Sequence, residues 1–549
     1  MSKMTVGGYL VRRLEQLGLR HVFGVPGDYV LGFFDLLVAS EMQVIGTCTE
    51  IGAGFAADGY ARVNGLGAVC ITYCVGGFNA LNAVAGAYAE KSPLIMISGA
   101  PGMNERARSP LLHHRVRDFN TQRLIFEKVT IASTALEDAV SAPQEIDRVL
   151  SACVLQKRPV YIELPRDMVN QPCAEPGALK IDSPRSDSQP LAEAVAEAAG
   201  MMKAARRPVI LGGVEIHRFG LQEPFLKLIE GTGYPVAAVL LGKSIISERH
   251  PQYLGIYEGA IGKETVRKAV EGSDCLLIMG AFLTDIDIGG FGTRIDPART
   301  VNATADRISI RHHHFDQVVL GDFLRALTKA PFGRPRRGNP RKPRRFVEVR
   351  PFKPVPRRPV TVRRFFQRMN DFLDQNTMVI CDIGDSLFGA ADLVIHRRTE
   401  FLSPAYYTSM GFSVPAAVGA QVNNRKLRPV VFVGDGAFQM TGMELSTAVR
   451  YGLNPIVFVL NNRGYTTERF IHEGPYNDVH EWAYHNLPQV LGAGWGCQVQ
   501  TEGQLEHALE QVRANDQAYA IINVELEPMD HSLALGRLAK RLGKRVGGK

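Results

Sequence analysis

Short apolar runs alternate with amphipathic segments along most of this 549-residue chain. In the first third, the apolar runs end in small or turn-forming residues, as strands of a buried parallel sheet do. We expect strands over residues 21–25, 43–48, 68–73, 94–98 and 160–163. Apolar positions at helical spacing predict helices over residues 6–17, 52–62 and 80–88. The alternation indicates a doubly wound parallel sheet of about five strands.

The same alternation continues to the end of the chain. The second third predicts strands over residues 208–211, 235–238, 275–279 and around Val301, with helices over 191–205 and 222–231. The last third predicts a helix over 362–373, a strand over 377–382 and a helix from 416. Strands over 430–433 and 456–460 flank a predicted helix over 440–451. A strand over 520–526 and a basic final helix complete the chain. The predicted fold class is therefore α/β, with three doubly wound, mainly parallel-sheet domains.

Composition shifts suggest where these domains meet. Proline and serine are frequent between Pro172 and Pro190, and a second run rich in proline and basic residues spans positions 331–359. The length is also too great for one hydrophobic core. We predict domains over residues 1–182, 190–330 and 360–549, with residues 331–359 as a linker.

The overall composition is that of an ordinary globular protein, with 45% hydrophobic and 21% charged residues. The sequence contains neither an apolar run of 18 residues nor a signal-peptide core, so we expect a cytoplasmic protein without a membrane segment. The eight cysteines include no CxxC pair, so neither a disulfide framework nor a zinc framework is indicated.

The net charge of +8 is concentrated in two places, the linker and the C-terminal tail. Residues 331–359 hold eleven Lys and Arg against the single Glu348. A solvated linker is the simpler interpretation, because stacking aromatic residues and a nucleic-acid-binding fold are not evident. The run His312-His313-His314 suggests a metal site, but consecutive residues of a strand point to opposite faces, so a surface strand is preferred.

The strongest chemical signal lies where two neighbouring strands end. Gly434-Asp435-Gly436 closes the strand at 430–433, and Asn462, 27 positions after Asp435, closes the next one. Glycines at a helix N-terminus let a phosphate approach backbone N–H groups. A carboxylate would repel that phosphate unless a cation lay between them, and hard oxygen ligands favour Mg²⁺ over zinc. Taken alone, GDG would more simply be a turn.

The GDG…NN pair resembles the cofactor motif of the thiamin diphosphate enzymes. The resemblance implies Mg²⁺ held by Asp435, Asn462 and the carbonyl of Gly464. It further implies that Met410 wedges between the two cofactor rings and that the carbonyl of Thr408 accepts a hydrogen bond from the pyrimidine. The remaining residues expected at the cofactor are Asp385, Gly434, Gly436, Ala437, Tyr465 and Thr466.

Glu50 is the candidate for activating the cofactor. It follows the strand at 43–48 and precedes Gly52, Ala53 and Gly54, which are small enough to let a ring approach. An alternative is structural, since Thr47 and Glu50 have the spacing of a helix capping box. The resemblance favours the catalytic role, in which a carboxylic acid hydrogen-bonds the pyrimidine ring.

Asp28 in VPGD, the pair His113-His114 and Glu468 resemble, together with Glu50, the reaction cavity of 2-oxo acid decarboxylases acting on pyruvate, indolepyruvate or phenylpyruvate. The resemblance spans essentially the whole chain. It implies non-oxidative decarboxylation to an aldehyde and CO₂, with Asp28, His113, His114 and Glu468 as acid–base residues. It also implies a homodimer or a dimer of dimers (a homotetramer), in which Glu50 and the histidines meet the diphosphate half across the interface. One chain is not expected to fold its own ends together.

Three pocket positions indicate the substrate. Leu387 and Thr467 replace bulkier residues of some pyruvate decarboxylases, and Ile471 is expected beside them. Bulky aromatic or branched substrates such as phenylpyruvate, indolepyruvate or branched-chain 2-oxo acids are therefore preferred. Pyruvate decarboxylase proper and a carboligase of the acetolactate synthase type remain alternatives, as does a catalytically idle regulator that contacts nucleic acid through the linker.

Overall fold

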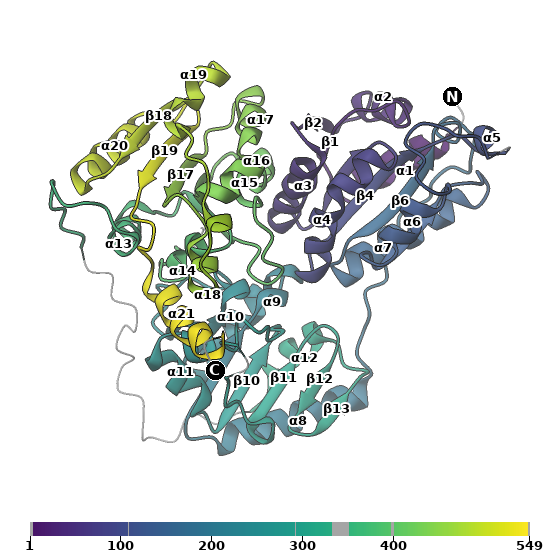
Figure 1. Ribbon diagram of the computed structural model, residues 1–549. Helices are drawn as coiled ribbons and strands as arrows, with labels where there is room; N and C mark the ends of the chain where they lie inside the picture. The colour runs from purple at the N-terminus through teal and green to yellow at the C-terminus, as the bar shows by residue number, and fades with distance from the viewer. Residues whose placement is uncertain (1–3, 108, 291, 332–350, 397–399, 547–549) are drawn as a thin grey trace.

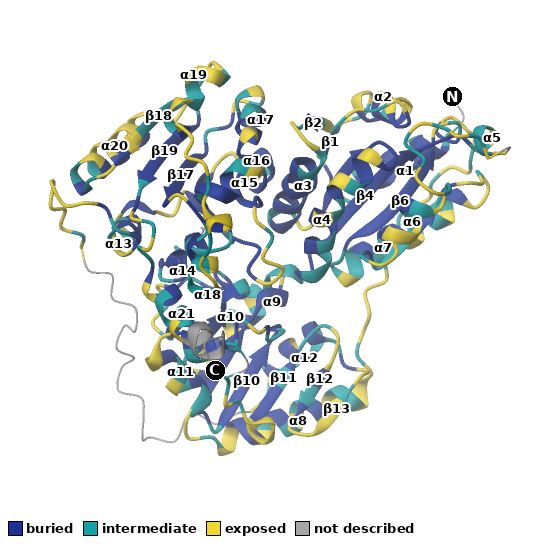
Figure 2. Cartoon of the chain, viewed as in Figure 1, coloured by how far each residue is buried: buried dark blue, intermediate teal, exposed yellow. Residues whose placement is uncertain are grey.

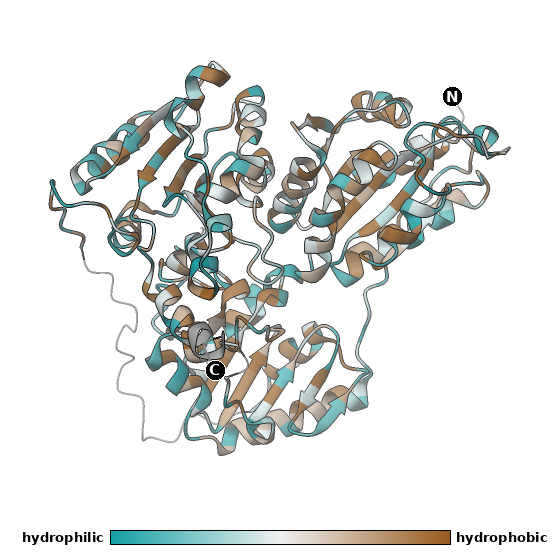
Figure 3. Cartoon of the chain, in the orientation of Figure 1, coloured by the Kyte–Doolittle hydropathy of each residue, from teal (hydrophilic) through white to brown (hydrophobic). Residues whose placement is uncertain are grey.

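The computed structural model describes residues 4–107, 109–290, 292–331, 351–396 and 400–546. Three mainly parallel sheets, each covered by helices, form an upper right, a lower and an upper left lobe in Figure 1. Most strands are buried and helix faces that point outward are exposed (Figure 2), and the hydrophobic residues concentrate in the strands (Figure 3). The predicted α/β class with three parallel-sheet units is confirmed.

The first sheet has six parallel strands in the order β2-β1-β3-β4-β6-β5. The sequence predicted about five, because β5 is short and polar. The strands are β1 (His21–Gly24), β2 (Gln43–Gly46), β3 (Gly67–Ile71), β4 (Leu94–Ala100), β5 (Ala132–Ala135) and β6 (Val160–Pro165). The helices are α1 (Val6–Gln16), α2 (Leu31–Val38), α3 (Glu50–Asn64), α4 (Val75–Ala89), α5 (Met103–Arg106), α6 (Thr121–Phe126) and α7 (Ala142–Gln156).

The second sheet has the order β13-β12-β11-β10-β7-β8-β9, with β12 and β13 antiparallel. Its strands are β7 (Pro208–Gly212), β8 (Val236–Val239), β9 (Tyr253–Tyr257), β10 (Cys275–Met279), β11 (Thr300–Ala303), β12 (Ile308–Ile310) and β13 (His313–Phe315). Its helices are α8 (Ser188–Ala204), α9 (Val214–Arg218), α10 (Gln222–Thr232), α11 (Glu264–Glu271) and α12 (Leu320–Leu327). The predicted surface strand at the histidine run is confirmed: His313 and His314 are exposed, pairing with Glu197 and Ser309.

The third sheet is parallel, in the order β15-β14-β16-β17-β19-β18. Its strands are β14 (Thr377–Cys381), β15 (Phe401–Leu402), β16 (Arg428–Gly434), β17 (Ile456–Asn461), β18 (Trp495–Val499) and β19 (Ala520–Glu525). Its helices are α13 (Val362–Phe372), α14 (Asp385–Ala390), α15 (Ser413–Asn423), α16 (Asp435–Thr441), α17 (Leu445–Arg450), α18 (Thr466–Ile471), α19 (Leu487–Leu491), α20 (Glu502–Ala514) and α21 (Leu533–Val546).

Two sequence predictions in this part of the chain need correction or remain open. The helix expected over 440–451 is instead two helices, α16 and α17, separated by the 3₁₀ turn η4 (Gly442–Glu444), and the first begins already at Asp435. The helix starts earlier than predicted because the pattern of GDG is typical of a loop, whereas its aspartate is the first helical residue. Most of the basic linker, residues 332–350, lies outside the described residues.

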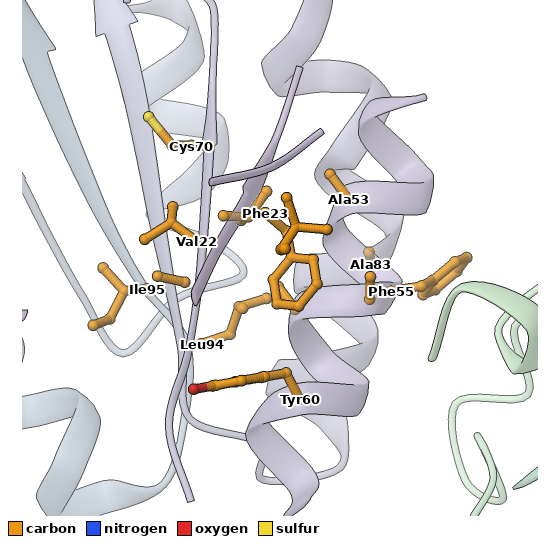
Figure 4. Packing of buried hydrophobic residues seen from close by; sticks show 14 of the residues in the cluster. Val22, Phe23, Ala53, Phe55, Tyr60, Cys70, Ala83, Leu94 and Ile95 are labelled. Atoms are coloured by element: carbon orange, nitrogen blue, oxygen red, sulfur yellow. The ribbon is translucent and has the colours of Figure 1, made fainter. Parts of the chain in front are cut away.

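The first and third domains pack directly against each other, which corrects the expectation that the ends of one chain stay apart. Helices α3 and α15 cross so closely that a Cβ on Gly419 would lie 1.8 Å from the carbonyl oxygen of Ala56. Phe55, on the side of α3 away from the residues in Figure 4 that fill its own domain, meets Phe412 with ring centroids 5.8 Å apart. Buried residues of both domains therefore belong to one hydrophobic cluster.

No helix of the described residues is both long and apolar enough to cross a bilayer. All eight cysteines are free, in keeping with the prediction of no disulfide framework. The cytoplasmic location stays a prediction.

Candidate active site

The carboxyl ends of β14, β16 and β17, three neighbours in the third sheet, gather oxygen-bearing side chains. Asp385 opens α14, Asp435 opens α16, and Asn462 directly follows β17. In open parallel sheets this edge is where ligands bind, because loops and helix N-termini converge there. The topology thus brings together residues that lie up to 77 positions apart in the chain.

Asp435 is buried, with 2% of its surface exposed. Its Oδ1 accepts from the backbone N–H of Gly436 at 2.7 Å and its Oδ2 from that of Gly464 at 3.0 Å. Burial raises the pKa of Asp435 to about 6, although these two N–H donors oppose the shift. The charge of Arg469 also opposes the shift, although Arg469 is paired with Asp478. A cation bound directly to the Asp435 carboxylate would stabilise it further.

The neighbouring loop supplies further oxygens of the same kind. The amide nitrogen of Asn462 donates to the hydroxyl of Thr466, so its carbonyl oxygen is the end available to a cation. Gly464 has a φ of 154°, and a Cβ there would lie 2.3 Å from the carbonyl of Asn477, so only glycine fits this turn. Asp435, Asn462 and Gly464 are the predicted magnesium ligands, and an all-oxygen set suits Mg²⁺.

Asp385 lies at the next strand end. Its Oδ2 accepts from the N–H of Ser532 at 2.7 Å, whereas its Oδ1 is buried without a hydrogen-bond partner in the described part of the chain. Burial raises the pKa of Asp385 to about 6. An orphaned acceptor next to the phosphate-binding edge is a position that a bound ligand can satisfy.

Thr408 and Met410 lie on a strained loop before α15. Thr408 has a φ of 60° and Gly411 one of 85°. The backbone N–H groups of Gly411 and Ser413 both donate to buried Asp382 at 3.0 Å, which fixes the loop. Met410 is consequently held 37% exposed instead of joining the core. Such a side chain is free to contact a ligand.

Asp28, His113 and His114 form a cluster in the first domain, with their ligating atoms all within 4.8 Å of one another. His113 Nε2 and Asp28 Oδ2 are 2.7 Å apart, within hydrogen-bond distance. The His113 ring stacks on Tyr29 with centroids 4.7 Å apart. His114 has a φ of 66° and a buried Nδ1 without a partner among the described residues. Adjacent acid and imidazole groups of this kind can store and pass a proton.

Glu50 is the first residue of α3, and its Oε2 accepts from Asn79 at 2.6 Å. The alternative capping-box interpretation is wrong, because Thr49, not Thr47, caps the helix by accepting from Gly52 at 3.0 Å. Thr47 instead donates to the carbonyl of Thr49. The Glu50 carboxylate therefore has no capping task.

The three predicted pocket residues differ in their surroundings. Thr467 and Ile471 lie with exposed Glu468 on α18, and a Cβ on Gly384 would be 3.8 Å from the Thr467 hydroxyl. Leu387 is fully buried within the hydrophobic cluster around the third sheet. Its predicted contact with substrate stays a prediction.

Comparisons with known proteins agree with this geometry. Models of the thiamine pyrophosphate (thiamin diphosphate) enzymes match at residues 4–122 (N-terminal TPP binding domain), 195–330 (central domain) and 382–524 (C-terminal TPP binding domain). A probable pyruvate decarboxylase of Schizosaccharomyces pombe is 34% identical, covering 99% of this chain and 96% of that protein. An indole-3-pyruvate decarboxylase of Azospirillum brasilense is 35% identical (94% and 95%), and an alpha-keto-acid decarboxylase of Mycolicibacterium paratuberculosis 36% (96% and 94%). This chain belongs to the thiamine pyrophosphate-dependent 2-oxo acid decarboxylases.

As such a decarboxylase, the protein is a carboxy-lyase whose cofactor is thiamine pyrophosphate. The described site fits that cofactor: the third domain presents helix N-termini and a buried acid at one sheet edge, and the first presents Glu50 beside small residues. Among the described residues, hydrogen bonds and ion pairs do not link the cluster of Asp28, His113 and His114 to Asp435.

Several residues that contact the candidate site residues were not predicted from the sequence. Asp382 fixes the loop that carries Met410, and Asn79 holds Glu50. Arg166 lies 3.8 Å from Asp28 and is also paired with Glu105. These residues come from separate parts of the fold, and no local sequence motif predicts their contacts. The position of Arg166 directly after the strand end Pro165 was the one available signal.

Proposed function

We propose that this decarboxylase converts bulky 2-oxo acids, aromatic or branched, to an aldehyde and CO₂ in the presence of Mg²⁺. The observation that carries the proposal is the hydrogen-bonded pair Asp28–His113, with His114 beside it. A decarboxylation that ends in an aldehyde needs a proton delivered to carbon, and this cluster is built to hold one. The relatives named as indole-3-pyruvate and alpha-keto-acid decarboxylases support the substrate class.

Magnesium would be held by Asp435, Asn462 and the carbonyl of Gly464. Buried Asp435 supports this assignment, because desolvation raises its pKa and the nearby Arg469 is already paired with Asp478. The ion would neutralise Asp435 and let the diphosphate approach the N-terminus of α16. Asp385, Gly434, Gly436, Ala437, Tyr465 and Thr466 would line the rest of the cofactor site.

Bound thiamine pyrophosphate supplies an electron sink for the pair of electrons left when CO₂ departs. Glu50 would hold a proton at the pyrimidine ring, with Asn79 orienting its carboxyl group. Met410 and the carbonyl of Thr408 would hold the rings of the cofactor. Asp28, His113, His114 and Glu468 would pass the proton that completes the aldehyde, titrating as a coupled group.

The active site would form between two chains, in a homodimer or a dimer of dimers. Support comes from the lack of polar contacts between the Asp28 cluster and Asp435 in the part of the chain that is described. It also comes from the exposed apolar residues Val75, Leu111, Val116, Met410 and Met440. A partner chain would bury side chains of this kind.

The deciding experiment is a panel of 2-oxo acids assayed with and without thiamine pyrophosphate and Mg²⁺. We expect aldehyde from phenylpyruvate, indolepyruvate or branched-chain 2-oxo acids at higher kcat/KM than from pyruvate, and loss of turnover after chelation. Preference for pyruvate, which the probable pyruvate decarboxylase among the relatives allows, would overturn the substrate class. Acetolactate without aldehyde would indicate a carboligase instead.

A further inference from the structure

Glu444 is a buried carboxylate between the first and third domains, with 2% of its surface exposed. It is the last residue of the 3₁₀ turn η4 in the third domain, yet its carboxylate oxygens accept hydrogen bonds from the first domain. Oε2 accepts from the N–H of Cys48 at 3.1 Å, and Oε1 from the N–H and hydroxyl of Thr49 at 3.1 and 3.2 Å. Thr447 of its own domain donates to Oε2 at 2.7 Å.

The space beside Glu444 is shaped for it. Gly52, in the first turn of α3, would place a Cβ 1.9 Å from Glu444 Oε1, so a larger residue would displace the carboxylate. The N–H groups of Cys48 and Thr49 directly precede Glu50, the first residue of α3. Glu444 therefore fixes the backbone of the two residues that directly precede Glu50.

The charge of Glu444 is balanced without a counter-ion. Ion pairs of the described residues do not involve it; four N–H and O–H donors and the positive end of α3 stabilise it instead. Burying a carboxylate costs free energy even when hydrogen bonds satisfy it, and an apolar contact would hold two domains together at lower cost. A role in placing a specific group accounts for this arrangement.

We propose that Glu444 is a positioning residue for Glu50, and the proposal rests on the cofactor-activating role proposed for Glu50. Asn79 fixes the carboxyl end of the Glu50 side chain, and Glu444 fixes its backbone end. Helix α16, which begins at Asp435, leads directly into η4 and Glu444. Glu444 thereby ties the start of α3, which carries Glu50, to the third domain of the same chain.

A matched control lies on the same interface. The hydroxyl of Tyr451 accepts from the N–H of Gly46 at 2.7 Å and donates to the carbonyl of Val44 at 3.3 Å. These contacts also join the two domains, but they end at β2 instead of the first turn of α3. Tyr451→Phe removes interdomain hydrogen bonds without touching the backbone next to Glu50.

The test compares full-length wild type, Glu444→Gln, Tyr451→Phe and Glu50→Gln. Loaded with thiamine pyrophosphate and Mg²⁺, each is mixed with D₂O, and exchange of the cofactor C2 proton is followed by NMR. Glu444→Gln keeps the shape of the side chain but makes it a weaker acceptor for the N–H groups of Cys48 and Thr49. We therefore expect exchange of the C2 proton to slow by about tenfold or more, as is usual when acid–base assistance is lost. Cofactor affinity should stay within about threefold, and Tyr451→Phe should exchange like wild type.

Amide hydrogen exchange of the cofactor-free protein gives a second readout. Residues 46–55 should exchange faster in Glu444→Gln than in wild type, because the N–H groups of Cys48 and Thr49 lose strong acceptors. Tyr451→Phe should leave the amides of Cys48 and Thr49 protected. Should Glu444→Gln fail to fold, Glu444→Asp, which retracts the carboxylate by one methylene, carries the same expectations.

C2 exchange at the wild-type rate in Glu444→Gln would overturn the proposal. If Glu444→Gln does not fold, the same rate in Glu444→Asp would overturn it. So would equal slowing by Tyr451→Phe, which would mean that only the integrity of the interface matters. Unchanged C2 exchange in Glu50→Gln would contradict the role of Glu50 itself, and this separates failure of the proposed function from failure of the Glu444 inference.

Discussion

At the residue scale, the buried carboxyl group of Glu258 links the stability of the fold to pH. Glu258 has a buried Oε1 that lacks a hydrogen-bond partner among the described residues. Desolvation, and secondarily the nearby charge of Asp392, raises the pKa of Glu258 from 4.5 to about 7. The folded state thus binds this proton more tightly than the unfolded state, so the associated stability is present below pH 4.5 and is lost as the pH rises through about 7.

Glu258→Gln should consequently stabilise the protein at pH 8, because the variant has no charge to desolvate. The expected gain is on the order of 3 kcal/mol. Urea unfolding at pH 8 and at pH 4.5 checks this, and the advantage should vanish at the lower pH. A gain of the same size at both pH values would show that the cause is packing and not ionisation.

Asp435→Ala should abolish the stabilisation of the protein by thiamine pyrophosphate with Mg²⁺. The substitution removes the buried carboxylate that faces the proposed metal. Thermal shift on adding cofactor and Mg²⁺ measures the effect, and wild-type protein should show a rise in Tm that the variant lacks. A wild-type shift in Asp435→Ala would place the metal elsewhere.

Glu50→Gln should separate binding from catalysis. The amide keeps the shape of the side chain and can still contact Asn79, but it cannot exchange a proton with the pyrimidine ring. Turnover should fall by about 10²-fold or more, the usual contribution of such acid–base assistance. Calorimetry should show cofactor affinity close to wild type, and a large loss of affinity would instead make Glu50 a binding residue.

At the scale of elements, the crossing of α3 and α15 is a close contact between the first and third domains. A Cβ on Gly419 would lie 1.8 Å from the Ala56 carbonyl, so Gly419→Ala must push two packed helices apart. We expect it to destabilise the protein by about 1–3 kcal/mol, as overpacking does. Gly200 in α8 has nothing within 4 Å of a Cβ, so Gly200→Ala should stabilise by about 0.4–1 kcal/mol. Urea unfolding of both variants measures the contrast, and equal effects would contradict the close crossing.

At the scale of the whole molecule, the question is whether one chain completes an active site. Glu50→Gln damages only the first domain and Asp435→Ala only the third. If sites form between chains, a hybrid dimer of the two variants contains one intact site. Co-refolding equal amounts should then recover ~25% of wild-type activity, as random pairing in a two-fold dimer requires. No recovery above the separate variants would show that each site belongs to one chain.

Much of the local structure follows from the sequence, because strand and helix periodicity is a local signal. Strands such as β7, β10 and β17 are continuous apolar runs and were predicted nearly to the residue. Strands β5 and β18 were not, because they are short edge strands with polar residues whose pairing depends on distant neighbours. The Asp435 motif was visible for the same local reason: glycines and an acid at a strand end need no partner to be recognised.

The residues that hold the site together were decided by tertiary structure alone. Nothing in the sequence near Glu50 points to Glu444, since they lie 394 positions apart and meet only because the first and third domains pack against each other. Likewise, Leu387 looks like any pocket residue in sequence, whereas packing buries it completely. The sequence by itself determined the three sheets and the cofactor motif, because each is a local pattern, whereas the acid–base roles of Asp28, His113, His114 and Glu468 stay predictions. Which of those groups meet, and which are held apart, depends on long-range packing that local patterns do not encode.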